Sequence, residues 1–295
     1  MAMKRTIMSI CGMILLIGLA GCGGKSGNEI AVGSKDFTES FIVAELYSLA
    51  LEDAGFDVER KYNLGGTNVV QAAMMKGDLD LYPEYTGTCL INVLKQEPMS
   101  NPEEIYNYIK EQYKEQFDLV LLNPSEANNS QGLAISKEIS DKYNIRTISE
   151  LQEKAENVRF ASQGAFEENT DGMPALIKTY GNFSFKEVNF FDNAIKYQLI
   201  KEKQADLIVA FTTDGQLVDP SYVLLNDDKH AWTTYNIVPI VRQNTLNQNQ
   251  AIEGILNKVS KKLDTETMQR LNAEVDINKR EPDEVAKEFY TQLSQ

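Results

Sequence analysis

The sequence predicts an α/β protein made of two units, each a mainly parallel sheet flanked by helices, with the second unit inserted into the first. Between residues 30 and 82, short apolar runs typical of strands alternate with segments of helical periodicity. This order is typical of a doubly wound sheet, whose ligands bind at the carboxyl ends of the strands. The same order begins again near residue 131. The cleft between two such units is a common place for a small-molecule site.

The first unit begins with an apolar strand at residues 30–33, followed by a helix from Glu39 to about Gly55. Glycine is a natural residue just past the end of a helix. A strand at residues 56–59 leads into a loop, and Thr67 is the candidate N-cap of the next helix. A turn at Gly77 then opens another strand, which completes a βαβαβ order.

The rest of the chain continues the pattern, and its last part is mainly helical. The spacing of apolar residues predicts strands at 131–136, 158–161, 206–211, 222–225 and 237–241, and helices at 148–157, 171–180, 192–203, 250–263, 265–274 and 284–293.

The first 28 residues are interpreted as an export signal and a tether. Lys4 and Arg5 precede an apolar stretch at residues 7–20, which is typical of a secretory signal peptide. Residues 19–22 (LAGC) resemble a bacterial lipobox, in which cleavage occurs before a cysteine that then carries lipid. We therefore expect a signal peptide at residues 1–21, a lipidated Cys22 and a flexible tether to residue 28. A plain signal peptide with an incidental cysteine is the alternative.

Composition excludes several classes of function. The 295 residues hold 29 Lys plus Arg against 43 Asp plus Glu, a net charge of -14, which argues against nucleic acid as a partner. The single histidine, His230, excludes most histidine-based metal and catalytic sites. No cofactor, metal or nucleophile motif is present, so no cofactor, no metal and no enzymatic activity are expected. Cys89 is the one cysteine left in the mature chain, so no intramolecular disulfide can form.

Three segments carry a specific resemblance: residues 33–39 (GSKDFTE), 63–67 (NLGGT) and above all 80–88 (DLYPEYTGT). They resemble the solute-binding components of ABC importers for glycine betaine, choline, carnitine and related quaternary amines. The resemblance implies a two-lobed periplasmic-binding-protein fold, type II-like, with the ligand in the cleft between the lobes. The implied lobes are residues 29–130 plus 235–295, and residues 131–234. It also implies a monomer that delivers its ligand to a membrane permease, lipid-anchored outside the cytoplasm on what we expect is a Gram-positive surface.

The family binds the trimethylammonium group in a cage of tyrosines, because aromatic faces attract a cation that cannot donate a hydrogen bond. Carried over by motif, the cage residues are Tyr82, Phe211 and Tyr235. Phe211 keeps the ring where the family has tyrosine. The resemblance adds three hydroxyl side chains to the predicted site, namely Thr67, Thr86 and Thr212.

Two departures from the family pattern bear on the ligand. Gln131 stands where the family often has another cage tyrosine, and Asn169 stands where it often has an arginine for the betaine carboxylate. A neutral amide cannot supply the charge-assisted pair that arginine gives. Choline, or a bulkier betaine such as ergothioneine, is therefore favoured over glycine betaine as the expected ligand. Lys35 is a candidate partner for a carboxylate, or else a solvated surface residue beside an acid.

Two other interpretations stay open from the sequence. The chain could bind an amino acid or another non-methylated amine in the same role. It could also be a secreted hydrolase that uses an Asp/Glu pair. Tight binding without turnover separates the transport role from the hydrolase.

Overall fold

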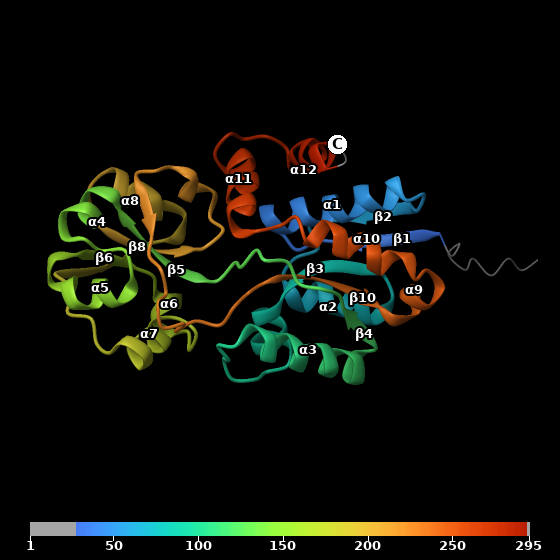
Figure 1. Ribbon diagram of the computed structural model, residues 1–295, viewed down its shortest axis with the longest axis horizontal. Helices are drawn as coiled ribbons and strands as arrows, with labels where there is room; N and C mark the ends of the chain where they lie inside the picture. Colours follow the sequence, from blue (N-terminus) through green and yellow to red (C-terminus); the bar gives the residue numbers. More distant parts are fainter. Residues whose placement is uncertain (1–27, 294–295) are drawn as a thin grey trace, which may run out of the picture.

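The structure is a computed structural model, and it describes residues 28–293. Two five-stranded sheets form two lobes joined by two extended segments (Figure 1). The first sheet has the order β2-β1-β3-β10-β4, and the second has the order β7-β6-β8-β5-β9. The strands of the first sheet lie within residues 29–121 and 237–242, and those of the second within residues 131–224.

In the first lobe, helices cover both faces of the sheet. Its elements are β1 (Glu29–Gly33), α1 (Thr38–Asp53), β2 (Asp57–Lys61), α2 (Thr67–Lys76), β3 (Leu81–Tyr85), the π-helix η1 (Thr88–Val93), α3 (Pro102–Phe117), β4 (Leu119–Leu121), β10 (Ile237–Arg242), α9 (Gln243–Gln248), α10 (Ala251–Ser260), α11 (Thr265–Asp276) and α12 (Pro282–Leu293).

The second lobe is smaller and has shorter helices. Its elements are β5 (Gln131–Ser136), α4 (Lys137–Tyr143), α5 (Ile148–Lys154), η2 (Ala155–Asn157), β6 (Arg159–Ser162), α6 (Gly164–Glu168), α7 (Met173–Tyr180), β7 (Glu187–Phe190), η3 (Asn193–Ile195), α8 (Lys196–Lys201), β8 (Leu207–Phe211), η4 (Gly215–Val218) and β9 (Tyr222–Leu224).

Both sheets are mainly parallel, with one reversed strand each. In the first sheet, β1 pairs parallel with β2 and β3, whereas β10 pairs antiparallel with β3 and β4, so β10 alone runs against the other strands. In the second sheet, β5 is the reversed strand, because it pairs antiparallel with β8 and β9. The two reversed strands are those by which the chain enters the second lobe and returns to the first. The predicted fold class, two α/β lobes with mainly parallel sheets, is confirmed.

Each sheet packs its alternate side chains into separate cores. On one face of the first sheet, Leu81 and Tyr85 pack with α1 and the C-terminal helices. On the other face, Tyr82 packs with residues of α2, η1 and α3. Because side chains alternate along a strand, the three-residue spacing of Tyr82 and Tyr85 puts their rings on opposite faces.

The two connecting segments are hydrogen-bonded to one another. Asn128 and Asn236 form an antiparallel bridge, and the Asn129 N–H donates to the Tyr235 carbonyl at 3.0 Å. Ser130 Oγ donates to the Thr233 carbonyl at 2.9 Å. The segments therefore run side by side between the lobes (Figure 1).

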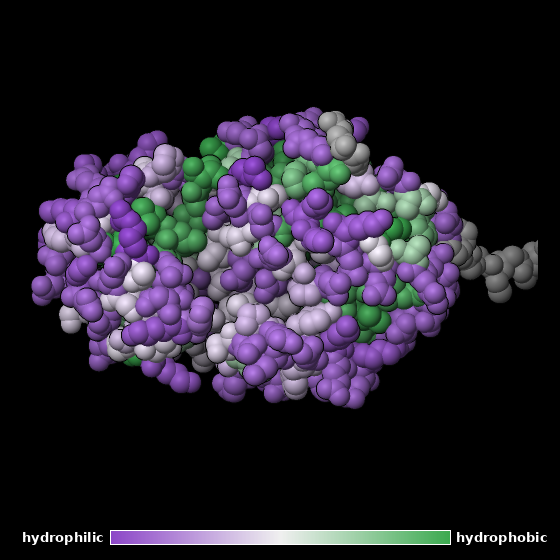
Figure 2. Space-filling view, in the orientation of Figure 1, coloured by the Kyte–Doolittle hydropathy of each residue, from purple (hydrophilic) through white to green (hydrophobic). Residues whose placement is uncertain are grey.

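The surface that faces the viewer in Figure 2 is mainly hydrophilic, with smaller hydrophobic patches, one of them near α11 and α12. No helix within residues 28–293 is long and apolar enough to cross a membrane. The predicted signal peptide, Cys22 and nearly all of the tether lie outside the described residues. Cys89 is buried, and it forms no disulfide within the part of the chain that the structure describes.

Candidate functional site

A cavity of about 520 Å³ opens between the two lobes and takes its walls from both of them. Residues that follow β1 and β3 line it from the first lobe, and residues at the end of β8 and the start of β5 line it from the second. The cavity therefore lies at the carboxyl ends of parallel strands, where doubly wound sheets bind ligands. The lining residues are Lys35, Phe37, Thr38, Glu39, Tyr85, Thr88, Asn92, Asn129, Gln131, Asn169, Phe211, Thr213, Asp214, Tyr235, Asn272 and Asp276.

Four aromatic side chains belong to this lining. Phe37 and Tyr85 come from the first lobe, with their ring centroids 6.0 Å apart and their planes inclined by 32°. Phe211 comes from the second lobe, and Tyr235 comes from the segment that returns to the first. Phe37 and Phe211 are 36% and 37% exposed, which leaves ring surface open to a ligand.

The position of Tyr235 depends on a glycine of the DLYPEYTGT segment. An added Cβ at Gly87 would lie 2.7 Å from two ring carbons of Tyr235, closer than real Cβ contacts come. The Tyr235 N–H donates to Asn128 Oδ1 at 2.7 Å, which fixes the backbone, and its hydroxyl donates to Asp171 Oδ2 at 2.8 Å. The ring is thus held at both ends and pressed against a backbone that has no side chain.

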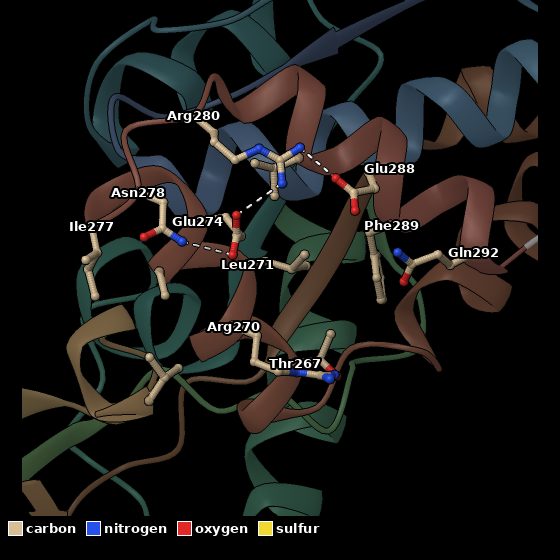
Figure 3. Close-up of a pocket in the computed structure, with 13 residues that line it drawn as sticks. Thr267, Arg270, Leu271, Glu274, Ile277, Asn278, Arg280, Glu288, Phe289 and Gln292 are labelled. Carbon is tan, nitrogen blue, oxygen red and sulfur yellow. Dashed lines mark hydrogen bonds and ion pairs between the residues drawn. The ribbon is translucent and has the colours of Figure 1, made fainter. Parts of the chain in front are cut away.

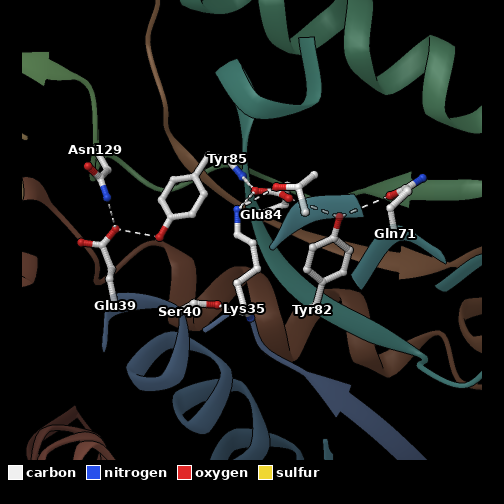
Figure 4. A network of polar contacts seen from close by, with 9 residues as sticks. Lys35, Glu39, Ser40, Gln71, Tyr82, Glu84, Tyr85 and Asn129 are labelled. Carbon is white, nitrogen blue, oxygen red and sulfur yellow. Dashed lines mark hydrogen bonds and ion pairs between the residues drawn. The ribbon is translucent and has the colours of Figure 1, made fainter. Parts of the chain in front are cut away.

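Glu39 lies at the first turn of α1 and lines the cavity, although it is only 3% exposed (Figure 4). Its Oε1 accepts hydrogen bonds from the Tyr85 hydroxyl at 2.8 Å and from Asn129 Nδ2 at 2.9 Å. Its Oε2 accepts one from Asn272 Nδ2 at 2.8 Å. Burial raises the pKa of the Glu39 carboxyl, and these hydrogen bonds act in the opposite direction.

Asp171 holds the second tyrosine in a similar way. It is 1% exposed, and it accepts from the Tyr235 hydroxyl and from the Thr233 N–H at 3.1 Å. Burial raises the pKa of the Asp171 carboxyl. Each cavity tyrosine therefore donates its hydroxyl to a buried carboxylate.

Lys35 reaches the cavity but is already paired. Its ammonium forms a buried ion pair with Glu84 and lies 3.4 Å from Thr67 Oγ1 (Figure 4). It also lies 4.7 Å from the centroid of the Tyr85 ring and 5.5 Å from that of Phe37. Lys35 is the one basic residue in the lining, and no arginine is among them.

On the side of the second lobe, Asp214 organises the wall around Phe211. Its Oδ2 accepts from the Phe211 N–H at 3.0 Å and from the Tyr197 hydroxyl at 2.9 Å, and it pairs with Lys196 Nζ at 2.6 Å. Lys196 in turn lies 5.3 Å from the centroid of the Phe211 ring. The negative charge of Asp214 is therefore balanced by Lys196, whereas the hydrogen-bond donors to Glu39 are neutral.

The structure brings five of the nine predicted ligand residues together. Lys35, Gln131, Asn169, Phe211 and Tyr235 all line the cavity. Gln131 is the register partner of Phe211 in the pairing of β5 with β8. Asn169 is exposed at the end of α6, and its Oδ1 accepts from the Asp171 N–H at 3.0 Å.

The structure places Tyr82 away from the cavity. Its side chain is fully buried in the core under α2 and α3, and its hydroxyl donates to Gln71 and Glu84 at 3.3 and 3.4 Å. It does not line the cavity. Tyr85, three residues further along the same strand, lies there instead, because strand alternation turns it to the opposite face.

The three predicted threonines also lie outside the lining of the cavity. Thr86 Oγ1 donates to the Thr234 carbonyl and accepts from the Asn236 N–H, both at 3.0 Å. Thr212 Oγ1 accepts from the Ser130 N–H at 2.9 Å. Both therefore tie the connecting segments in place. Thr67 is the first residue of α2, whose N-cap is Gly66 rather than Thr67 as predicted.

Sequence reasoning missed several lining residues, above all Phe37, Tyr85 and Glu39. All three belong to the segments that carry the family resemblance, so a signal was present at the level of the motif. No sequence signal marked Asn129 and Asn272, because these two residues reach the cavity only when segments distant in the sequence come together.

A second cavity, of about 400 Å³, lies between α11, α12 and η4 (Figure 3). Arg280 spans it by ion pairs to Glu274 and Glu288, at 3.1 and 2.6 Å. Phe289 is the one aromatic ring in its lining. This cavity therefore has no aromatic cage that could bind a cation. Within residues 28–293, no three His, Cys, Asp or Glu side chains form a group that could hold a metal ion.

Comparison with known proteins gives a consistent result. The model of the substrate binding domain of ABC-type glycine betaine transport systems matches residues 28–292. The carnitine transport binding protein OpuCC of Listeria monocytogenes is 31% identical over 299 residues, which cover 97% of this chain and 96% of that protein. A glycine-betaine-binding protein of Pseudomonas aeruginosa is 32% identical over 297 residues, with 97% and 94% covered.

The ergothioneine transport permease/ergothioneine binding protein EgtU of Helicobacter pylori is 33% identical over 265 residues. The match covers 90% of this chain but 47% of that protein, so the chain spans about half its length. Among solved structures, one described as a glycine betaine/carnitine/choline ABC transporter superposes with a TM-score of 0.84 at 25% identity, covering 89% of this chain and 98% of that one.

Proposed function

The chain belongs to the family of substrate-binding domains of ABC-type glycine betaine transport systems, and from that premise we propose that it captures a quaternary ammonium compound in the cavity between its lobes. As a member of this family it is an extracytoplasmic binding protein that delivers a small ligand to an ABC permease. We propose in addition which class of small ligand it binds and which residues bind that ligand.

The observation that carries the proposal is the set of four aromatic rings around one cavity: Phe37, Tyr85, Phe211 and Tyr235. A trimethylammonium group spreads its charge over methyl groups and donates no hydrogen bond, so ring faces suit it better than polar side chains do. Each desolvated contact contributes about 2 kcal/mol or more. Asp214 is paired with Lys196 and Lys35 with Glu84, which leaves Glu39 and Asp276 as the lining acids that favour a cationic ligand further.

The rest of the ligand is constrained by what the lining lacks. Asn169 stands at the predicted arginine position, and Lys35 is committed to Glu84. A ligand carboxylate would therefore find no free cation there. This favours choline, or a larger betaine with other polar groups, over glycine betaine. The names of relatives span glycine betaine, carnitine and ergothioneine, and all of these belong in the test.

We further propose that the lobes, residues 29–130 plus 235–295 and residues 131–234, close about the two connecting segments. Hinges need only a few residues to absorb such a rotation. Small-angle scattering should show compaction when ligand saturates the protein. An unchanged radius of gyration would contradict closure, and the same experiment reports whether the protein is the monomer that we propose.

The proposed anchor is a lipid on Cys22, with the signal peptide at residues 1–21 and the tether at 22–28, on a Gram-positive surface. Palmitate labelling of cells that express the full chain should mark the wild type and not Cys22→Ala. Equal labelling and equal membrane retention of both would exclude the anchor.

Isothermal titration calorimetry of the mature protein against choline, glycine betaine, carnitine, ergothioneine and unmethylated amino acids tests the ligand class. We expect binding of at least one quaternary amine and none of its unmethylated counterpart. Recovery of intact ligand by mass spectrometry after incubation tests the absence of turnover. Binding confined to unmethylated amines, or hydrolysis of the ligand, would refute the proposal.

A further inference from the structure

The two cavity tyrosines share an arrangement that a simple aromatic cage does not require. Tyr85 donates to Glu39 and Tyr235 donates to Asp171, each at 2.8 Å. The carboxylates are 3% and 1% exposed. Their other hydrogen-bond donors are two asparagine amides and a backbone N–H, all of them neutral. Each tyrosine is thus backed by a negative charge that its own partners do not compensate.

Three other buried acids of the described residues are compensated by a basic side chain. Glu45 pairs with an arginine, Glu84 with a lysine and Asp206 with an arginine. Within residues 28–293, no such ion pair is formed by Glu39 or Asp171. An unpaired buried carboxylate is costly, and burial raises the pKa of both groups. Hydrogen bonds offset that cost only in part, so a site with two such groups beside one cavity needs an explanation.

We propose that Glu39 and Asp171 are specificity-determining residues, whose charges behind Tyr85 and Tyr235 make the cavity select a cation over a neutral molecule of the same shape. This inference rests on the proposed function. A quaternary ammonium donates no hydrogen bond, so its charge partner does not have to touch it. The carboxylates act across the rings, in an interior where charges are weakly screened.

The placement of the two charges suggests why they come as a pair. Glu39 lies on α1 of the first lobe, whereas Asp171 lies just before α7 of the second. Closure of an empty cavity would leave two uncompensated negative charges around it. A cation bound between the lobes compensates both of them, so the same ligand charge that selects the molecule also favours the closed state.

The test compares each quaternary amine that binds with its tert-butyl analogue, in which carbon replaces the charged nitrogen. The probes are 3,3-dimethylbutan-1-ol for choline and 3,3-dimethylbutanoate for glycine betaine. Competition calorimetry gives the ratio of the two dissociation constants for the wild type, Glu39→Gln and Asp171→Asn. Each variant should lower the preference for the ammonium compound over its analogue about tenfold or more, and change the affinity for the uncharged 3,3-dimethylbutan-1-ol little.

Two controls separate charge from structure. Glu45→Gln changes a buried acid six residues further along α1 that has its own arginine, and it should leave the ratio unmoved. Glu39→Asp keeps the charge and should retain most of the preference. A role in positioning the tyrosines alone would lower both affinities equally and leave the ratio unchanged in Glu39→Gln and Asp171→Asn, which would overturn the inference.

The wild type supplies a readout that needs no variant to fold. A preference for the cation within about threefold of unity would also overturn the inference, because one charge interaction of this kind exceeds that factor. Failure of the proposed function looks different, since the wild type would then bind none of the quaternary amines.

Discussion

Gly87→Ala tests how the cage tyrosine is held. The backbone of Gly87 is in the right-handed helical region, with φ -64° and ψ -38°, so alanine brings no backbone strain. The added Cβ would instead lie 2.7 Å from the Tyr235 ring. An ordinary carbon contact is about 3.5 Å, so the ring must move by roughly 0.8 Å. Its 2.8 Å hydrogen bond to Asp171 would lengthen beyond bonding distance.

The cost follows from what the ring loses. A displaced aromatic wall forfeits most of a cation–π contact of about 2 kcal/mol, and the lost hydrogen bond adds about 1 kcal/mol. We expect the ligand to bind roughly tenfold to a hundredfold more weakly in calorimetry. The melting temperature of the ligand-free protein should also fall, because overpacking costs about 1–3 kcal/mol.

Gly254→Ala is the matched control. Gly254 lies inside α10, and an added Cβ there meets nothing within 4 Å. Alanine should raise helix stability by roughly 0.5–1 kcal/mol and leave affinity unchanged. If Gly87→Ala binds ligand as tightly as Gly254→Ala and melts no lower than the wild type, Tyr235 is not held as described.

Three further predictions follow from the same contacts. Tyr82→Phe should leave ligand affinity unchanged in calorimetry, because this hydroxyl makes only long hydrogen bonds outside the cavity, and a large loss would return Tyr82 to the site. Burial raises the pKa of Glu39 in the folded protein, so the native state binds more protons than the unfolded state above about pH 4.5. Its contribution to stability therefore falls as the pH rises from about 4.5 toward the raised pKa of Glu39 in the folded protein, and Glu39→Gln should gain stability relative to wild type over that range in chemical denaturation; a constant difference would contradict this. Asn169→Arg should raise the ratio of glycine betaine to choline affinity by supplying a cation at the cavity, and an unmoved ratio would mean that Asn169 does not face the ligand.

The sequence was sufficient for the architecture because the architecture depends on local periodicity. The strand at 237–241 and the helix at 265–274 match β10 and α11 within two residues. The family assignment from the DLYPEYTGT segment is confirmed by the match over residues 28–292. No prediction covered α3, although Asn101 caps it through two backbone N–H groups and Pro102 opens it.

The site was less predictable because its contacts join distant segments. Asn272 reaches Glu39 across 233 residues, and no local pattern announces such a contact. Tyr82 and Tyr85 lie in one motif, and which of the two lines the cavity depends on which face of β3 turns toward it. That is decided by the packing of α2 and α3 against one face and α1 against the other. Strand alternation separates the two tyrosines but does not say which one faces the ligand.

The central claim is that a quaternary ammonium group binds between the lobes against four rings. The most direct measurement is a crystal structure of the mature protein with the tightest-binding amine from calorimetry. We expect the charged nitrogen within about 6 Å of the ring centroids of Phe37, Tyr85, Phe211 and Tyr235. An ammonium group bound elsewhere, for example in the cavity that Arg280 spans between α11 and α12, would contradict it.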